Sequence, residues 1–287
     1  MQQPEILSAV TTPFSPDGEV DLAALTANLR RIEPLVDGVF AAGTTGEFLA
    51  LSQDEHEEII TAALEAFGPN RVVVHVGAAS TRDAVALARQ SSRLGATRFA
   101  AITPYYLKAS TEGILRHWSA INEACDGDLY GYVFPDVAVT DLLPEDLPRV
   151  LASGIKGIKV SATASGRVDE YLAHAPEGFQ LWSGNDADVP HVMAAGGTGT
   201  VSGVSGAVPG PWAALRDAMA AGDQEAADKA QAVIARVVPV LGPSIANLKV
   251  ALDRQGLTGG TCRMVIDAPT PETLSQIDEV VALANQS

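Results

Sequence analysis

Two lysines lie three positions apart in the apolar run at residues 154–160, Lys156 near its start and Lys159 near its end. Residues three apart on a β-strand point to opposite faces, so only one of the two can face an enclosed interior. Burial removes water from an ammonium group and lowers its pKa, which makes the amine a nucleophile toward carbonyl groups. Lys159, at the carboxyl end of the run, is the candidate nucleophile. A lysine at the rim paired with a carboxylate is the alternative from this run alone.

Two other segments carry polar groups that suit the same chemistry. Tyr132 ends the preceding apolar run, and its phenol could move protons while an imine forms and a carbon–carbon bond breaks. Residues 43–47, Gly-Thr-Thr-Gly-Glu, contain two glycines that allow a sharp turn, which would present N–H groups and two hydroxyls to a small anion. Taken alone, Tyr132 could simply be a packed tyrosine, and residues 43–47 could be an ordinary glycine turn. Together with Lys159, they match the needs of an enzyme that acts on a 2-oxo acid.

These candidates lie at the ends of short apolar or β-branched runs that recur between helical patterns. The runs begin near Ile6, Gly38, Val72, Phe99, Leu129, Gly154, Phe179 and Gly199. Apolar strands alternating with amphipathic helices predict an α/β fold, and eight such units favour a closed (β/α)8 TIM barrel over an open doubly wound sheet. Such barrels place their catalytic groups at the carboxyl ends of the strands. We predict a barrel over residues 1–215 and a small C-terminal helical extension over residues 216–287.

Composition narrows the classes of partner and location. Acidic residues outnumber basic ones by 35 to 19, and the formal net charge of −16 disfavours binding to nucleic acid or to an anionic membrane. Cys125 and Cys262 are far apart, which indicates free thiols in a reducing compartment. The sequence shows no signal-peptide pattern and no apolar run long enough for a membrane span, so we predict a cytoplasmic location. The five histidines lack metal-ligand spacing, and we expect neither a metal nor a cofactor.

The motifs resemble those of the dihydrodipicolinate synthase/N-acetylneuraminate lyase family of pyruvate-dependent class I aldolases, almost from end to end. The motifs that carry the resemblance are Gly43-Thr-Thr-Gly-Glu47, Thr103-Pro-Tyr-Tyr106, Tyr132-x-x-Pro135, Gly157-Ile-Lys159 and Gly184-x-Asp186. The resemblance implies that Lys159 forms a Schiff base with pyruvate, that Tyr132 shuttles protons and that Thr44 links it to Tyr106. Because that last tyrosine reaches into a neighbouring subunit in the family, it also implies a homo-oligomer, either a dimer or a tetramer.

The same resemblance assigns the residues that bind substrate. Thr44 and Thr45 would hold the pyruvate carboxylate, while Gly184 and Val201 would line the pyruvate pocket. The second substrate would be an aldehyde. The imine then accepts electrons when a carbon–carbon bond is made or broken, without a metal.

Departures from the family pattern bear on the aldehyde. In the synthases an arginine that grips the aldehyde's carboxylate occupies the position of Val137, whereas Ser161 and Asp186 resemble residues of the sugar-acid lyases. We therefore predict a lyase acting on a 2-keto-3-deoxy sugar acid or a related 2-oxo acid. The alternatives are a 4-hydroxy-tetrahydrodipicolinate synthase, a dehydratase of keto-deoxy sugar acids, and a metabolite-binding paralogue without turnover.

Overall fold

Eight parallel strands follow one another in sequence order around a closed barrel in the computed structural model, which describes residues 3–242 and 244–286. The strands are β1 (Glu5–Ala9), β2 (Gly38–Ala41), β3 (Val72–His75), β4 (Arg98–Ile102), β5 (Asp128–Val133), β6 (Gly157–Val160), β7 (Gln180–Ser183) and β8 (Gly199–Ser202). The predicted TIM barrel is confirmed. Met1 and Gln2, which begin the segment expected to lack a signal peptide, lie outside the described residues.

Helices alternate with the strands and continue after the last one. They are α1 (Leu22–Ile32), α2 (Gln53–Phe67), α3 (Thr81–Arg93), α4 (Thr111–Asn122), α5 (Pro135–Ala138), α6 (Leu147–Val150), α7 (Val168–Ala173), α8 (Val189–Ala194), α9 (Gly210–Ala221), α10 (Gln224–Leu241), α11 (Ile245–Asp253) and α12 (Pro271–Ala284). Short polar side chains start several of them, as expected for N-caps. Ser52 and Glu55 form a capping box at the start of α2.

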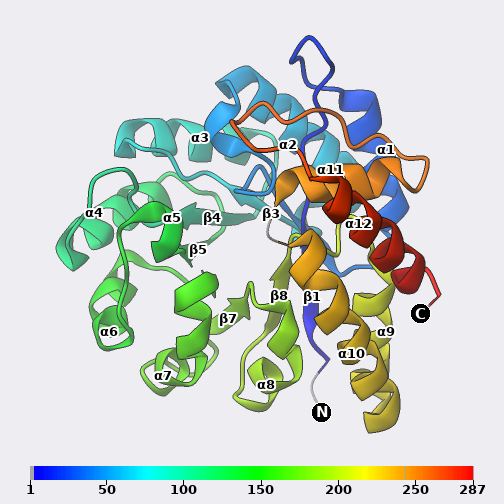
Figure 1. Ribbon diagram of the computed structural model, residues 1–287. Helices are drawn as coiled ribbons and strands as arrows, with labels where there is room; N and C mark the ends of the chain where they lie inside the picture. The colour runs from blue at the N-terminus through cyan, green and yellow to red at the C-terminus, as the bar shows by residue number, and fades with distance from the viewer. Residues whose placement is uncertain (1–2, 243, 287) are drawn as a thin grey trace. The chain divides into compact units, whose positions relative to one another are not determined.

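The chain divides into two compact units, and the first contains both ends of the described chain. It comprises the described residues up to Arg71 and those from Val201 onward. Its C-terminal part is helical: α9 packs on α10, and α10 and α11 both pack on α12 (Figure 1, yellow to red). These helices form the expected C-terminal extension. The predicted boundary after residue 215 falls inside α9 and stays a prediction.

The second unit spans Val72–Thr200 and contains β3 to β7 with the beginning of β8. A single row of partners crosses four of its strands: Ile102 pairs with Tyr132, Tyr132 with Lys159, and Lys159 with Trp182. All four side chains are buried. Because partners in register project to the same face of a sheet, this row places Lys159 between two large aromatic rings.

Among residues 3–242 and 244–286, no single helix is long and apolar enough to cross a bilayer, although α10 and α11 together, as a bent pair, have the length and composition of a span.

Candidate active site

Lys159 lies near the end of β6 and is almost completely buried, with 6% of its surface exposed. Burial lowers the pKa of Lys159 to about 7, and the negative charge of Asp186 opposes this shift only in part. An amine with such a pKa is about half neutral at pH 7 and can attack a carbonyl group. Lys156, by contrast, precedes β6 and is exposed. The two lysines of residues 154–160 therefore have the different surroundings that the strand pattern predicts.

Tyr132 is the aromatic neighbour of the amine. The Lys159 Nζ lies 4.2 Å from the centroid of the Tyr132 ring, and His75 meets the same ring edge-on at 6.0 Å between centroids. The Tyr132 side chain is buried. The expectation that Tyr132 and Lys159 are neighbours is confirmed by their register.

Asp186, which follows β7, carries the negative charge that raises the pKa of Lys159. Its side chain is only 3% exposed, and the Thr200 hydroxyl lies 3.0 Å from its Oδ1. The same hydroxyl is 2.8 Å from the Ser183 carbonyl oxygen, so Thr200 holds the carboxylate against the end of β7. Sequence reasoning singled out Asp186 but not Thr200, which carries no motif of its own.

Gly184 and Ser161 lie together at the carboxyl ends of β7 and β6. A Cβ atom at Gly184 would come within 2.6 Å of Ser161 Oγ, so a larger residue there would require that hydroxyl to move. The Gly184 N–H also donates to the Val160 carbonyl over 2.7 Å. The structure thus brings together two residues that were predicted separately to bind substrate.

Val137 and Tyr106 lie at the surface of the second unit. Val137, on α5, is 52% exposed, and Tyr106 is 84% exposed. Tyr106 also has a φ of 72°, a conformation that is strained for a bulky side chain. Within the described chain, Tyr106 therefore does not join the buried group around Lys159.

The turn after β2 lies in the first unit. The Gly46 N–H donates to the Gly43 carbonyl, and the Glu47 N–H donates to the Thr44 carbonyl, each over 3.0 Å. Thr44 and Thr45 are half-buried. A Cβ at Gly203 would lie 3.2 Å from Thr45 Oγ1, so this turn approaches the end of β8, where Val201 is buried.

Sequence reasoning missed a second buried lysine. Lys249 on α11 is 2% exposed and forms an ion pair of 2.6 Å with Glu47, the last residue of the Gly43–Glu47 motif, whose carboxylate is completely buried. The signal was present, since Lys249 stands in the apolar run Leu248-Lys-Val-Ala-Leu252 of a chain with few lysines. Its partner could not be identified because Glu47 is two hundred residues away in sequence.

Comparisons with known proteins agree with this fold. The sequence profile of the dihydrodipicolinate synthetase family matches residues 2–284. The 4-hydroxy-tetrahydrodipicolinate synthase of Laribacter hongkongensis is 32% identical, over 97% of this chain and 98% of that protein.

Solved structures give the same result. The dihydrodipicolinate synthase of Thermotoga maritima superposes with a TM-score of 0.91 at 26% identity, and the match covers 100% of both chains. A monomeric dihydrodipicolinate synthase variant gives a TM-score of 0.90 at 27% identity, with 99% of this chain and 97% of that chain covered. The chain therefore belongs to the dihydrodipicolinate synthetase family, and it is an enzyme of the carbon–carbon lyase class of aldolase type.

Proposed function

We propose that the protein joins pyruvate to an aldehyde through a Schiff base on Lys159. The observation that carries this proposal is the buried amine of Lys159, whose pKa is lowered to about 7 beside the Tyr132 ring. An ordinary lysine is almost fully protonated at neutral pH and is a poor nucleophile. A desolvated lysine keeps a useful fraction of neutral amine and can attack the keto carbon of a 2-oxo acid.

The reaction follows from the electron balance of the imine. The neutral amine adds to the pyruvate ketone, and the carbinolamine takes up one proton as water leaves, which gives a cationic imine. Loss of a methyl proton then delivers the C–H electron pair to that cation and forms a neutral enamine. The enamine carbon attacks the aldehyde, the aldehyde oxygen gains a proton, and water hydrolyses the imine to release product and lysine. The reverse sequence cleaves the same bond.

Tyr132 serves as the proton carrier in this proposal. Carbinolamine collapse and carbon–carbon bond formation each require a proton to move at the reacting atoms. Tyr132 is buried and is the strand neighbour of Lys159. Its resemblance to the family tyrosine supports the assignment, with Thr44 and Tyr106 completing the relay.

The carboxylate of pyruvate is assigned to Thr44 and Thr45. Their turn offers hydroxyls and backbone N–H groups, which bind small anions well. Gly184 and Val201 are assigned to the walls of the pyruvate pocket on the same resemblance. Ser161 and Asp186 remain candidates for contacts with the second substrate.

The residues that depart from the synthase pattern suggested a sugar-acid substrate, but the comparisons favour the aldehyde of the synthase reaction. The curated relatives are named 4-hydroxy-tetrahydrodipicolinate synthase, which supports the synthase alternative over a lyase of 2-keto-3-deoxy sugar acids. The dipicolinate skeleton has seven carbons, of which pyruvate supplies three. The aldehyde must therefore supply the other four carbons, the nitrogen and the second carboxylate, as aspartate semialdehyde does. We therefore place the synthase reaction first.

One observation keeps the sugar-acid reaction as the second candidate. Val137 is half exposed and apolar, whereas the synthases use an arginine at the matching position to grip the aldehyde's carboxylate. A valine there offers that carboxylate no charge.

Assembly and location follow the family in this proposal. The exposed Tyr106 supports a homo-oligomer, a dimer or a tetramer, while a monomeric variant exists among the structural neighbours. The strong negative charge supports a protein with neither nucleic acid nor membrane as partner, and we place it in the cytoplasm.

Reductive trapping tests the central step. The protein is incubated with pyruvate and borohydride, and the adduct is located by peptide mass spectrometry. An adduct at Lys159, absent from Lys159→Met, is the expected result. No adduct, or an adduct at Lys156 or Lys249, contradicts the proposal.

A substrate panel then separates the candidate reactions. Consumption of pyruvate with aspartate semialdehyde identifies the synthase, and release of pyruvate from 2-keto-3-deoxy sugar acids identifies the lyase. Loss of water from those acids without pyruvate release identifies a dehydratase. Trapping without any turnover identifies a binding protein.

A further inference from the structure

Glu47 has an unusual backbone conformation at the end of the Gly43–Glu47 turn. Its φ is 56°, in the left-handed region, and its side chain is completely buried. A residue with a Cβ keeps this conformation only where its surroundings impose it. The contacts of its carboxylate show what those surroundings are.

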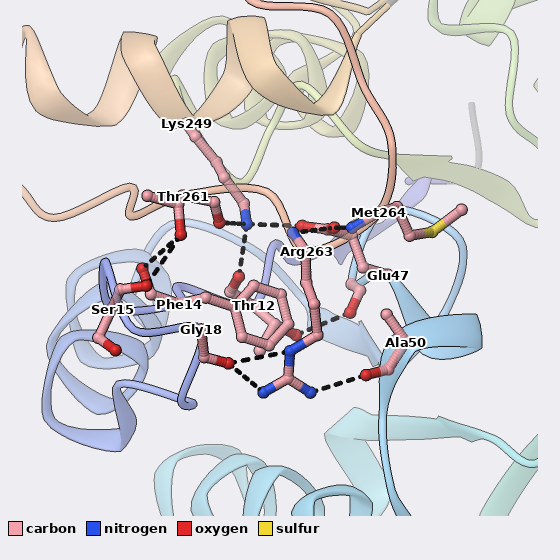
Figure 2. Close-up of polar contacts among 11 residues, drawn as sticks. Thr12, Phe14, Ser15, Gly18, Glu47, Ala50, Lys249, Thr261, Arg263 and Met264 are labelled. Carbon is pink, nitrogen blue, oxygen red and sulfur yellow. Dashed lines mark hydrogen bonds and ion pairs between the residues drawn. The ribbon is translucent and has the colours of Figure 1, made fainter.

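One carboxylate oxygen of Glu47 faces Lys249 (Figure 2). The Lys249 Nζ donates to Glu47 Oε1 over 2.6 Å, to the Thr12 carbonyl over 2.8 Å and to the Thr261 carbonyl over 2.5 Å. An ammonium group has three N–H donors, so every donor of Lys249 has an acceptor. The buried charge is fully satisfied.

The other oxygen of Glu47 binds the backbone of the C-terminal segment at residues 261–264. The Arg263 N–H donates to Glu47 Oε2 over 2.8 Å, and the Met264 N–H donates to the same atom over 2.7 Å. Phe14, which follows β1, forms a β-bridge with Thr261. The segment therefore also contacts the chain that leaves β1. Glu47 thus joins the turn directly to a segment more than two hundred residues later.

Thr12 closes the connection on the other side of the turn. Its carbonyl accepts from Lys249, and its hydroxyl donates to the Gly46 carbonyl over 2.8 Å. Two consecutive residues of the turn, Gly46 and Glu47, are therefore held by one hydrogen-bonded network. Thr44 and Thr45 immediately precede them.

We propose that Glu47 is a positioning residue, whose buried ion pair with Lys249 and bonds to residues 261–264 fix the turn that presents Thr44 and Thr45 to the substrate's carboxylate. This inference rests on the proposed function, because it takes Thr44 and Thr45 to bind that carboxylate. A buried ion pair adds little net stability compared with a well-packed apolar pair of the same volume. It does impose a single geometry, since each of its donors and acceptors has a fixed partner.

Pyruvate affinity is the property that this network controls. The measurement is the pyruvate concentration that gives half-maximal borohydride trapping at Lys159, together with the trapping rate at saturation. Glu47→Gln keeps the shape of the side chain and removes its charge. We expect the half-saturating concentration to rise about tenfold or more, while the rate at saturating pyruvate stays within twofold of the wild type.

A second variant allows for the instability of an unpaired buried ammonium. The double variant Glu47→Leu with Lys249→Met removes both charges and keeps the volume, so the fold is not left with an uncompensated charge. It also cuts the bonds to Arg263 and Met264, and we expect the same rise in half-saturating pyruvate. A folded variant with wild-type pyruvate affinity, or one that loses affinity and saturating rate in equal measure, overturns the proposal.

Glu55 provides the matched control. Its carboxylate binds the Arg263 guanidinium over 2.7 Å, so it anchors the same C-terminal segment without touching the turn. Glu55→Gln should leave the half-saturating pyruvate concentration within twofold of the wild type. A rise equal to that of the Glu47 variants would show that general loosening of the segment, and not the turn, sets the affinity.

Hydrogen exchange on the wild-type protein decides the question even where the variants fail to fold. If the turn and residues 261–264 are coupled, binding at one slows opening of the other. The amides of Arg263 and Met264 should exchange several-fold more slowly after reductive trapping of pyruvate, and unchanged exchange contradicts the inference. Failure of the wild type to trap pyruvate at Lys159 would refute the proposed function instead, so the two failures are distinguishable.

Discussion

The Lys159 Nζ lies 4.2 Å from the centroid of the Tyr132 ring, on the neighbouring strand of the barrel. An aromatic face attracts a cation, and this contact is worth about 0.5–2 kcal/mol for the protonated amine. Removing an ammonium group from water costs several kcal/mol. Burial lowers the pKa of Lys159 to about 7, because its effect is larger than that of the Asp186 charge, which raises the pKa.

The rate of imine formation should follow the neutral fraction of Lys159. With a pKa of about 7, the amine is mostly protonated at pH 6 and mostly neutral at pH 8, so the rate should rise about tenfold between them and then level off. Trapping with pyruvate and cyanoborohydride measures it, after correction by a simple amine under the same conditions. A rate that still climbs tenfold per pH unit up to pH 9 would indicate an ordinary lysine.

Replacing Lys159 with Met should stabilise the fold while abolishing trapping. The pKa of Lys159 is about 7 in the folded protein and 10.5 in the unfolded chain. Below pH 7 the group is charged in both states, so the full cost of burial applies. Between pH 7 and 10.5 only the unfolded chain holds the proton, so wild-type stability rises with pH.

Denaturant unfolding of Lys159→Met and the wild type checks this expectation. The variant should be more stable at pH 6.5 by an amount on the order of 3–5 kcal/mol, and the difference should shrink toward pH 10. The exposed Lys156→Met is the control, with a change of less than about 0.5 kcal/mol at either pH. Equal stability of Lys159→Met and the wild type at pH 6.5 would mean that Lys159 carries no burial cost.

Asp186→Asn should move the pH dependence of trapping to lower pH. The negative charge of Asp186 raises the pKa of Lys159, so its removal lowers that pKa further and increases the neutral fraction at pH 6. Trapping at pH 6 should become several-fold faster, and Asn can still accept from Thr200. Asp188→Asn, at an exposed position two residues away, should leave the profile unchanged.

Tyr132→Phe should separate imine formation from turnover. The ring contact with Lys159 remains, so the final yield of trapped adduct at saturating pyruvate should be retained, although the imine should form more slowly without the phenol. Loss of the phenol should reduce turnover with the active aldehyde by about 100-fold to 10,000-fold, the usual contribution of a positioned proton carrier. Turnover within threefold of the wild type would assign the proton transfers to another group.

Val137→Arg should change the preference among aldehydes. Val137 is half exposed, so the fold has room for a longer side chain. If position 137 faces the aldehyde's carboxylate, arginine should raise kcat/KM for aspartate semialdehyde by about tenfold, since a charge-assisted hydrogen bond is worth roughly 1.5–3 kcal/mol. Leu143→Arg, also at an exposed position of the same unit, should have no such effect, and an equal gain there would point to general electrostatic attraction.

Much of the barrel could be predicted from sequence because each strand is a short apolar run. The run predicted from Gly154 contains β6, although the strand itself begins at Gly157. Glycine and lysine at the start of that run carry no signal for where the parallel pairing begins. Lys159 and Tyr132 were identified because alternation along a strand and the order of strands fix which residues become neighbours.

The environment of Lys249 could not be predicted in the same way. Helical spacing places it among apolar residues, and a buried lysine requires a partner that only the tertiary fold supplies. Glu47 was part of a recognised motif, yet its place there suggested a turn and not an ion pair. The fixed position of Asp186 against Thr200 was missed for the same reason, because their hydrogen bond depends on how β7 and β8 pair.

The two buried lysines also determine how the chain meets amine-directed reagents. Of the five lysines, Lys108, Lys156 and Lys229 are exposed, while Lys159 and Lys249 are buried. Among the lysines, a bulky acylating reagent should therefore modify only the three exposed ones. A small keto acid should instead label Lys159 selectively. Few lysines are exposed, and none of them is the reactive Lys159. The protein could therefore be coupled to a support through its exposed lysines, and we expect activity to be retained after immobilisation.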